Sequence, residues 1–291
     1  MKRPRQVFAM TGIAPEWQAY AMAKYSRSAQ SLQDSARELT ADRTRKFLNT
    51  MYFKYGHASI ADMAHVSLAV EQISLWAAIT LLDEQLWDGQ ERSTRYQPFR
   101  ETGFLIPDGA PEGFALAADW LMGRYERTIA HWMDRLKDQY PCPESMRATE
   151  YEAALRARAF DIARYYLFLG VNTSVGQINS ARTLERQVAR LLADSLPEVR
   201  ALGLDLKAAA TEQTPFDLSA ERLMPLVERV PEPVRSELLA QLKSEPIAPT
   251  LIKYAEPTPY QLGVYGELAA IGRELLPAVA PDNQTPVVLT V

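Results

Sequence analysis

The chain has 291 residues, of which 47% are hydrophobic and 23% charged, and its formal net charge is −4. This composition is typical of one or two folded domains and excludes a general electrostatic attraction for nucleic acid or an anionic membrane surface. A single cysteine, Cys142, excludes an internal disulfide and argues against a zinc-thiolate cluster, so we expect no metal site. No unbroken apolar segment resembles a secretory signal or is long enough to span a bilayer, so we expect a cytoplasmic protein.

The N-terminal part of the chain shows helical patterns. Pro15 stands at a suitable first position of a helix, and apolar residues recur at helical spacing through the next turns. Thr40 can cap a second helix, which Gly56 is placed to end in a left-handed conformation. Ser59, with Asp62 three residues later, resembles the capping box of a third helix.

That third helix is expected from about residue 60 to residue 87, where apolar residues form overlapping stripes on most sides. Such a helix belongs in the middle of the molecule. Gly89 would break it, so residues 90–96 are expected in a loop or strand that leads out of it. Residues 104–107 are expected to form a short strand.

Further helices are expected over about residues 111–136, 144–169 and 181–193. The last two carry rows of arginines, and we interpret most of these as solvated residues or as partners of the many glutamates. Cys142 lies between two prolines, which indicates a turn between the first two of these helices.

The C-terminal part is rich in proline, because eleven of the nineteen prolines lie from Pro215 onward. The prolines break this part into short helices, such as residues 234–242 and 260–275. We therefore expect one domain over residues 1–213 and a Pro-rich helical extension over residues 214–291. The final residues, 286–291, are expected to form a strand, either at a partner's sheet edge or in a chain that continues.

Part of a nucleotide-binding signature follows Gly89. Gln90, Ser93, Arg95 and Tyr96 match the second half of a motif that reads Arg-His-Arg, two free positions, Ser, one free position, Asn or Gln, two free positions, and Ser-x-Arg-Tyr. The sequence Asp-Glu-Gln at positions 83–85 stands where that motif has Arg-His-Arg. In this pattern the chain resembles the flavin-dependent thymidylate synthases of the ThyX family.

Two further patches support the resemblance, in the order and spacing of the family. The sequence Gly-His-Ala-Ser at positions 56–59 is similar to the family's Gly-His-x-Ser/Thr. Residues 163–167, Thr173 and residues 180–184 resemble the family's Ala-Arg-x-x-Leu-Pro, its threonine and its Asn-Ala-Arg-x-Leu helix. Together the patches extend over roughly residues 52–207.

The resemblance implies a predominantly helical α+β fold of the ThyX type and the reductive methylation of dUMP to dTMP. It implies FAD as cofactor, methylenetetrahydrofolate as carbon donor and NADPH as reductant. It also implies a homo-oligomer, a tetramer in the family, or a second ThyX-like half in place of another subunit. No side chain is assigned a catalytic role, because the ring-activating step would belong to the flavin.

The resemblance also implies roles for individual residues. Ser93 and Arg95 match residues that hold the nucleotide, which suits a hydroxyl beside a guanidinium fork. Gln90 and Tyr96 match residues that would shape the same pocket. Arg182 matches a helix arginine, which we group with the nucleotide-binding residues. His57 matches a histidine on the folate and flavin side.

The substituted half of the motif argues against the cofactor. In the family, the arginines and the histidine lie against FAD, whose pyrophosphate is anionic, whereas Asp83 and Glu84 carry the opposite charge. At an effective dielectric constant near 20, a contact ion pair is on the order of 4 kcal/mol, so two reversed contacts would cost several powers of ten in affinity. We therefore expect that this chain alone does not hold FAD in the family manner.

Three functions are compatible with the sequence. The first is a divergent thymidylate synthase whose missing cations come from another subunit or chain segment. The second is a nucleotide-binding module without flavin, and the third is a scaffold with a vestigial pocket. Taken alone, the site residues also have structural interpretations. Ser93 can close a turn, Arg95 can pair with Glu91, and His57 can cap or pack beside a helix-ending glycine.

Overall fold

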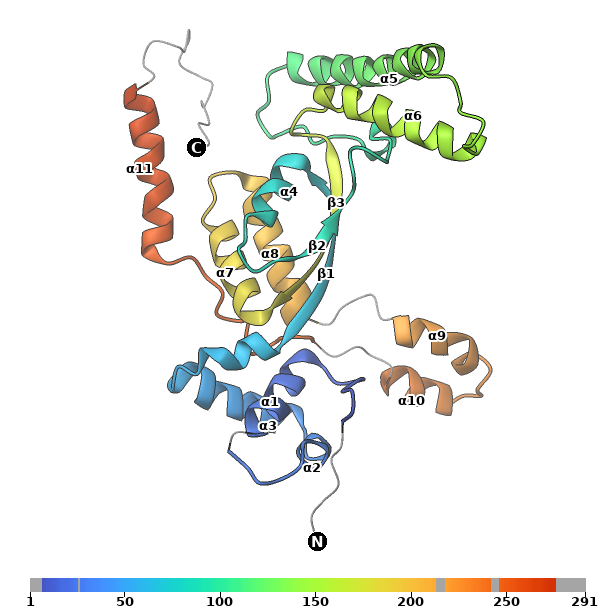
Figure 1. Ribbon diagram of the computed structural model, residues 1–291. Coiled ribbons are helices and arrows are strands. Elements are labelled where there is room, and N and C mark those ends of the chain that lie inside the picture. Colours follow the sequence, from blue (N-terminus) through green and yellow to red (C-terminus); the bar gives the residue numbers. More distant parts are fainter. Residues whose placement is uncertain (1–6, 26, 213–217, 242–245, 276–291) are drawn as a thin grey trace. The chain divides into compact units, whose positions relative to one another are not determined.

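The computed structural model describes residues 7–25, 27–212, 218–241 and 246–275 (Figure 1). Helices dominate these residues, and three strands form one sheet in the order β1-β3-β2. The fold is therefore α+β and predominantly helical, which confirms the prediction. The chain divides into two compact units, one made of residues 1–67 and 178–291 and the other of residues 68–177. We call them the terminal unit and the central unit; the domain boundary expected at residue 213 stays a prediction.

The terminal unit begins with α1 (Pro15–Tyr25), α2 (Leu32–Arg37) and α3 (Ala41–Leu48), followed by a π-helical turn over Asn49–Lys54. As expected, Thr40 caps α3, because its side-chain oxygen accepts a hydrogen bond from the backbone N–H of Arg43. Gly56 ends this segment at φ +68°, in the left-handed region.

The prediction of a long helix over residues 60–87 is wrong. The chain there forms a 3₁₀ helix, Ala58–Met63, then β1 (His65–Ser74) and α4 (Leu75–Leu82). Valine and isoleucine positions in β1 are buried while most of their neighbours are exposed, and the strand pairs with β3 (Asn172–Ser180), which the sequence did not predict. Pairing with a distant strand therefore outweighs the helical spacing of the apolar residues. The expected capping box is also absent, since the 3₁₀ helix begins after His57 without a side-chain cap.

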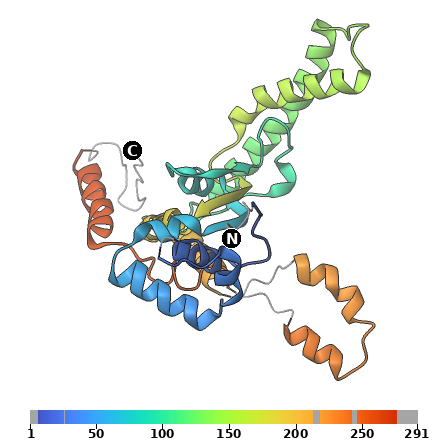
Figure 2. The same ribbon diagram turned by 60° about the horizontal axis from the view of Figure 1, so that its bottom comes forward.

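The central unit contains α4, β2 (Asp88–Glu91), α5 (Gly113–Gln139) and α6 (Ala148–Ala163), with 3₁₀ turns at Arg100–Thr102 and Arg164–Tyr166. The helices α5 and α6 lie side by side (Figures 1 and 2). Their facing side chains enclose an apolar cluster that includes Phe99, Tyr125, Phe160 and Val171.

Three predictions in this unit can be compared with the structure. Cys142 is exposed in the α5–α6 connection, as expected. The strand expected at residues 104–107 is reduced to one bridge between Phe104 and Val171. The helix expected over residues 144–169 ends at Ala163, because the chain turns there and enters β3.

The remaining helices belong to the terminal unit: α7 (Ala181–Leu192), α8 (Pro197–Thr211), α9 (Leu218–Val227), α10 (Val234–Gln241) and α11 (Pro259–Leu275). Helices α7 and α8 pack together, as do α9 and α10 (Figure 1). The C-terminal part is thus helical, as predicted, whereas the strand expected at residues 286–291 lies outside the described residues. Across the described ranges, no helix is both long and apolar enough to cross a bilayer.

Gly89 sets the approach of β2 to β3. A Cβ atom at this position would overlap the carbonyl oxygen of Gly176 and the ring of Trp87. The same indole Nε1 donates to Oε1 of Gln177 at 3.0 Å, which fixes the ring against β3. Gly89 is therefore required for strand pairing. Its expected role in breaking a helix is wrong, because α4 already ends at Leu82.

We predict that Gly89→Ala lowers the free energy of unfolding by about 3 kcal/mol, because backbone has to move to admit the methyl group. Gly176→Ala is the matched control, since a Cβ there meets nothing within 4 Å. Urea unfolding of both variants measures the difference. Equal stability of the two variants would contradict the close approach.

Glu16 of α1 anchors a distant loop of the same unit. Its buried carboxylate accepts hydrogen bonds from the backbone N–H groups of Thr250 and Leu251, each at 2.5 Å. Burial raises the pKa of Glu16, although these two N–H groups act in the opposite direction. The buried charge is therefore only partly offset by its partners.

This arrangement predicts a pH dependence. A carboxyl whose pKa is raised on folding stabilises the protein below its unfolded pKa and loses that contribution as the pH rises through the folded value. We expect the free energy of unfolding to fall as the pH rises above 4.5, the ordinary pKa of glutamate. In Glu16→Gln this fall should disappear, because the amide oxygen still accepts both N–H groups but carries no charge. Urea unfolding at several pH values, with Glu212→Gln as an exposed control, tests this; an unchanged slope in Glu16→Gln would count against it.

Candidate functional site

The loop after β2 is held in a fixed turn. The backbone N–H of Arg92 donates to the carbonyl of Ser174 in β3 at 2.9 Å. The Arg92 guanidinium donates to the carbonyl of Pro98 at 3.2 Å and lies 5.5 Å from the ring centroid of Phe99. One side chain thus joins both ends of the segment that carries the family motif.

Ser93 closes the turn inside this segment. Its hydroxyl oxygen accepts from the backbone N–H of Arg95 at 3.2 Å, and its carbonyl accepts from the N–H groups of Tyr96 and Gln97 at 3.3 and 3.1 Å. The structural interpretation of Ser93 is therefore confirmed. The hydroxyl proton is not used in this contact, so it remains able to donate to a ligand oxygen.

Arg95 reaches α6 and meets a group of charges that we call the arginine cluster: Arg95, Arg158, Arg164 and Asp161. The Asp161 carboxylate lies 3.1 Å from Arg95 Nε, 3.5 Å from Arg158 Nη1 and 3.4 Å from Arg164 Nε. The pairing of Arg95 with Glu91 considered above is wrong; its partner is Asp161.

The arginine cluster has an excess of positive charge. Three guanidinium groups share one carboxylate, and no other carboxylate pairs with them in the part of the chain that the structure describes. Asp161 is 20% exposed and the arginines between 38% and 65%, so each ion pair contributes little to stability. An arriving dianion can compete with Asp161 for the same donors. A phosphate monoester carries nearly two negative charges at neutral pH and accepts such fork-shaped donors.

Gln90 and Tyr96 flank the cluster in sequence. Gln90 lies in β2 with an exposed side chain, and Tyr96 is 63% exposed. The described structure contains no side-chain hydrogen bond for either residue, so both are available to a ligand. Together with Ser93 and Arg95, they belong to the central unit.

Arg182 and His57 belong to the terminal unit, where they have partners of their own. Arg182 Nη2 lies 2.6 Å from Asp62 Oδ2, and Arg27 Nη2 lies 3.2 Å from His57 Nε2. Beside Arg182 on α7, Glu185 accepts a hydrogen bond from the Tyr52 hydroxyl at 2.8 Å. Burial and this carboxylate raise the pKa of Tyr52, which keeps the phenol protonated.

The end of α4 bears on the binding of FAD. Asp83 is the C-cap residue of this helix and is exposed, and Glu84 follows it. Their carboxylates add to the negative end of the helix dipole, which repels an anion. These residues do not fit the flavin pyrophosphate that the Arg-His-Arg positions would meet.

A comparison with protein families settles the relationship. The model of the family described as thymidylate synthase complementing protein matches residues 9–216. The chain belongs to this family. It is the ThyX family whose motifs the sequence resembles.

Two curated relatives are considerably longer than the chain. A UPF0159 protein of Chlamydia muridarum is 25% identical over 186 residues, which are 60% of this chain and 35% of that protein. A UPF0159 protein of Chlamydia pneumoniae is 24% identical over 227 residues, 68% of this chain and 43% of that protein. The chain therefore spans less than half of the length of either relative.

Solved structures are also similar to this chain. ThyX of Helicobacter pylori, in complex with FAD and dUMP, is 14% identical with a TM-score of 0.44, covering 68% of this chain and 89% of its own. The UMP/dUMP methylase PolB of Streptomyces cacaoi, bound to 5-Br dUMP, is 15% identical with a TM-score of 0.39, covering 67% and 84%.

The sequence placed Arg164 in a family patch but did not predict the cluster, because most arginines of this helix were interpreted as solvated residues or as partners of glutamates. Arg158 and Arg164 each stand three residues from Asp161, which places them beside it on the helix and its continuing turn. That spacing was the available signal. It did not indicate that Arg95, 66 positions away, reaches the same carboxylate.

We predict that Asp161→Asn increases the affinity of the protein for inorganic phosphate about tenfold, because the variant removes the carboxylate that competes for the guanidinium groups. The matched control is Glu152→Gln, which removes an exposed α6 carboxylate that pairs with Lys137. Isothermal titration calorimetry at constant ionic strength measures both affinities. Weaker phosphate binding in a folded Asp161→Asn variant would show that Asp161 organises the arginines and does not compete with the ligand.

Proposed function

We propose that this chain binds the phosphate of a dUMP-like pyrimidine nucleotide at the arginine cluster and takes part in the flavin-dependent methylation of dUMP to dTMP. One observation carries the proposal: Arg95, the arginine of the family motif, meets two further arginines around a single carboxylate. The residual charge of this group matches that of a nucleoside monophosphate.

In this proposal the motif residues contact different parts of the nucleotide. Arg95 and the Ser93 hydroxyl contact phosphate oxygens, and Arg158 and Arg164 add charge from α6. Gln90 and the exposed Tyr96 ring contact the rest of the nucleotide. Arg182 and His57 are proposed to act on the nucleotide and on the folate and flavin side, respectively, as the family resemblance implies.

A complete enzyme would need cations that this chain lacks at its own flavin positions. We propose that they come from another subunit of a homo-oligomer, a tetramer in the family, or from a second ThyX-like half. Interface-built sites allow this, and more than half of each curated relative lies outside the matched region. Methylenetetrahydrofolate and NADPH would then act as cosubstrates of the assembled enzyme, which we place in the cytoplasm.

A second candidate is a nucleotide-binding pseudo-subunit that holds no flavin. The acidic pair Asp83 and Glu84 at the end of α4 favours it. The two candidates share the nucleotide site and differ only in whether a completed assembly binds FAD.

For nucleotide binding, we predict that Arg95→Met weakens the binding of dUMP about tenfold or more, since a charge-assisted contact to phosphate is lost. Arg147→Met is the matched control, because Arg147 is an exposed arginine that pairs with Glu150 at the start of α6. Calorimetric titration with dUMP, and with deoxyuridine as a ligand without phosphate, checks the prediction. If Arg95→Met binds dUMP as tightly as Arg147→Met, the pocket is vestigial.

For the cofactor, we predict that the purified chain shows no flavin bands in its visible absorbance spectrum after incubation with excess FAD and desalting. The triple variant Asp83→Arg, Glu84→His, Gln85→Arg restores the family signature and should retain more flavin, because it replaces repulsion by attraction.

Asp108→Arg, which changes an exposed acid outside the signature, controls for unspecific charge effects. Flavin bands retained by the unmodified chain would show that other residues hold the cofactor, and would favour a complete enzyme over a pseudo-subunit.

A further inference from the structure

Arg92 lies in the motif loop at a position to which the family resemblance assigns no role. It occupies one of the two free positions between Gln90 and Ser93. Its side chain is partly buried, and no carboxylate pairs with it in the ranges that the structure describes. Its contacts are instead with backbone and aromatic groups of the central unit.

Arg92 closes the loop that it begins. Its backbone N–H donates to the carbonyl of Ser174 in β3 at 2.9 Å, so the first residue of the loop takes part in the pairing of the sheet. Its guanidinium donates to the carbonyl of Pro98 at 3.2 Å and lies 5.5 Å from the centroid of the Phe99 ring. Phe99 is fully buried in the apolar cluster. Arg92 therefore connects the end of the loop at the sheet with the end that is fixed in the core.

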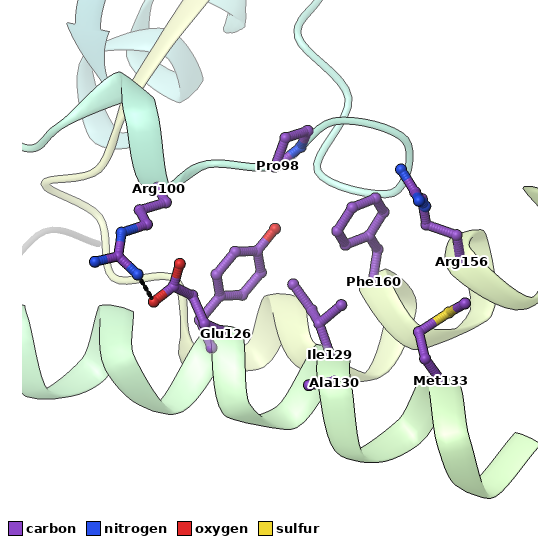
Figure 3. A pocket seen from close by; sticks show the side chains of 9 residues that line it. Pro98, Arg100, Glu126, Ile129, Ala130, Met133, Arg156 and Phe160 are labelled. Carbon is purple, nitrogen blue, oxygen red and sulfur yellow. Dashed lines mark hydrogen bonds and ion pairs between the residues drawn. The ribbon is translucent and has the colours of Figure 1, made fainter.

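The far end of the loop lies against α5 and α6. In Figure 3, Pro98 and Arg100 lie on the segment that passes over these helices, and Arg100 forms an ion pair with Glu126 of α5. Pro98 and Phe160 of α6 line the same hollow. Phe160 directly precedes Asp161, the carboxylate of the arginine cluster. The loop is thus held beside the helix to which Arg95 extends.

The guanidinium of Arg92 is turned toward the protein. Its Nε atom is buried and forms no hydrogen bond with any described residue, and its Nη2 atom donates to Pro98. A buried donor without an acceptor and a partly buried cation without a carboxylate both lower stability, so an apolar side chain of similar length would suit the fold at least as well. Stability alone does not account for an arginine at this position.

The turn between the two fixed ends carries the groups that we assign to the nucleotide phosphate. The hydroxyl oxygen of Ser93 accepts from the backbone N–H of Arg95, and Arg95 Nε lies 3.1 Å from Asp161 Oδ1. The side chain of Arg95 is 52% exposed, so it reaches this partner consistently only if its backbone is held in place. A loop without such restraint would lose conformational entropy each time the contact formed.

We propose that Arg92 is a positioning residue, which holds the turn at Ser93 so that Arg95 joins the arginines of α6 before the nucleotide arrives. Arg92 itself does not contact the ligand. The inference rests on the proposed nucleotide function, because a site that is organised in advance binds its ligand more tightly.

The first test is calorimetric titration of the full chain with dUMP. Arg92→Met should weaken binding about fivefold, because the hydrogen bond that closes the loop is lost. Arg92→Lys keeps a donor for the carbonyl of Pro98 and a cation for the ring of Phe99, so its affinity should lie within about twofold of that of the unmodified chain. Arg127→Met changes an exposed arginine of α5 and is the matched control, which should bind dUMP normally.

A double-mutant cycle separates positioning from a direct effect on the ligand. In the Arg95→Met background there is no guanidinium to position, so the addition of Arg92→Met should change the affinity for dUMP less than about twofold. A direct contact with the ligand, or a general electrostatic attraction, would instead give the same loss in both backgrounds.

The position of Arg95 can also be followed without nucleotide. Its side-chain Nε–H resonance in a nitrogen–proton NMR spectrum is assigned by its absence from the spectrum of Arg95→Met. In Arg92→Met this resonance should move toward its position in Asp161→Asn, in which the carboxylate partner is lost. In Arg92→Lys it should stay near its original position. Arg92→Gln, with a shorter and uncharged side chain, replaces Arg92→Met in both tests if that variant does not fold.

Three results would overturn the inference. The first is an Arg95 resonance that stays in place when Arg92 is replaced in a folded protein. The second is a loss of dUMP affinity that is equally large with and without Arg95. The third is unchanged dUMP affinity in Arg92→Met although Arg95→Met weakens binding. If Arg95→Met itself leaves dUMP binding unchanged, the nucleotide proposal fails, and the resonance alone decides whether Arg92 positions Arg95.

Discussion

The backbone pairing of β3 is the constraint on which the described site depends. β3 is the middle strand of the sheet, and its neighbours β1 and β2 are far from it in sequence. Gly89 permits β2 to approach the carbonyl of Gly176, and the Arg92 N–H continues the pairing to Ser174. The motif loop begins at this point. Without that register, Ser93 and Arg95 would have no fixed position relative to α6.

Charge distribution separates the two halves of the family motif. The retained half leads to a cluster in which three arginines share Asp161, and the substituted half places Asp83 and Glu84 at the negative end of a short helix. The first arrangement attracts a dianion and the second repels one. A net charge of −4 for the whole chain conceals this local contrast. In the proposed function, the first arrangement holds the nucleotide phosphate and the second does not hold a flavin pyrophosphate.

This contrast explains why a partner is central to the proposed function. Substituted residues at the flavin positions, together with retained residues at the proposed nucleotide site, are the pattern expected of one part of a composite site. Helix α6 supplies Arg158 and Asp161 to the arginine cluster, and Arg164 follows in the next turn.

The sequence by itself determined the features that depend on local chemistry or on residue order. Examples are the cap at Thr40, the left-handed Gly56, the helices on either side of Cys142, and the family to which Gln90, Ser93, Arg95 and Tyr96 point. It also located the reversed charges at Asp83 and Glu84. Short-range hydrogen bonds and backbone preferences depend on a few neighbouring residues, so they can be predicted without knowledge of the fold.

Only the tertiary structure decided the features that depend on distant partners. Residues 65–74 have an apolar pattern that suits a helix, yet they form a strand because they pair with β3, which follows about 100 residues later. The sequence likewise did not show that Arg158 and Arg164 meet Arg95 at one aspartate. Non-local pairing of this kind leaves no periodic trace in a single sequence, because its energy comes from groups brought together by the fold.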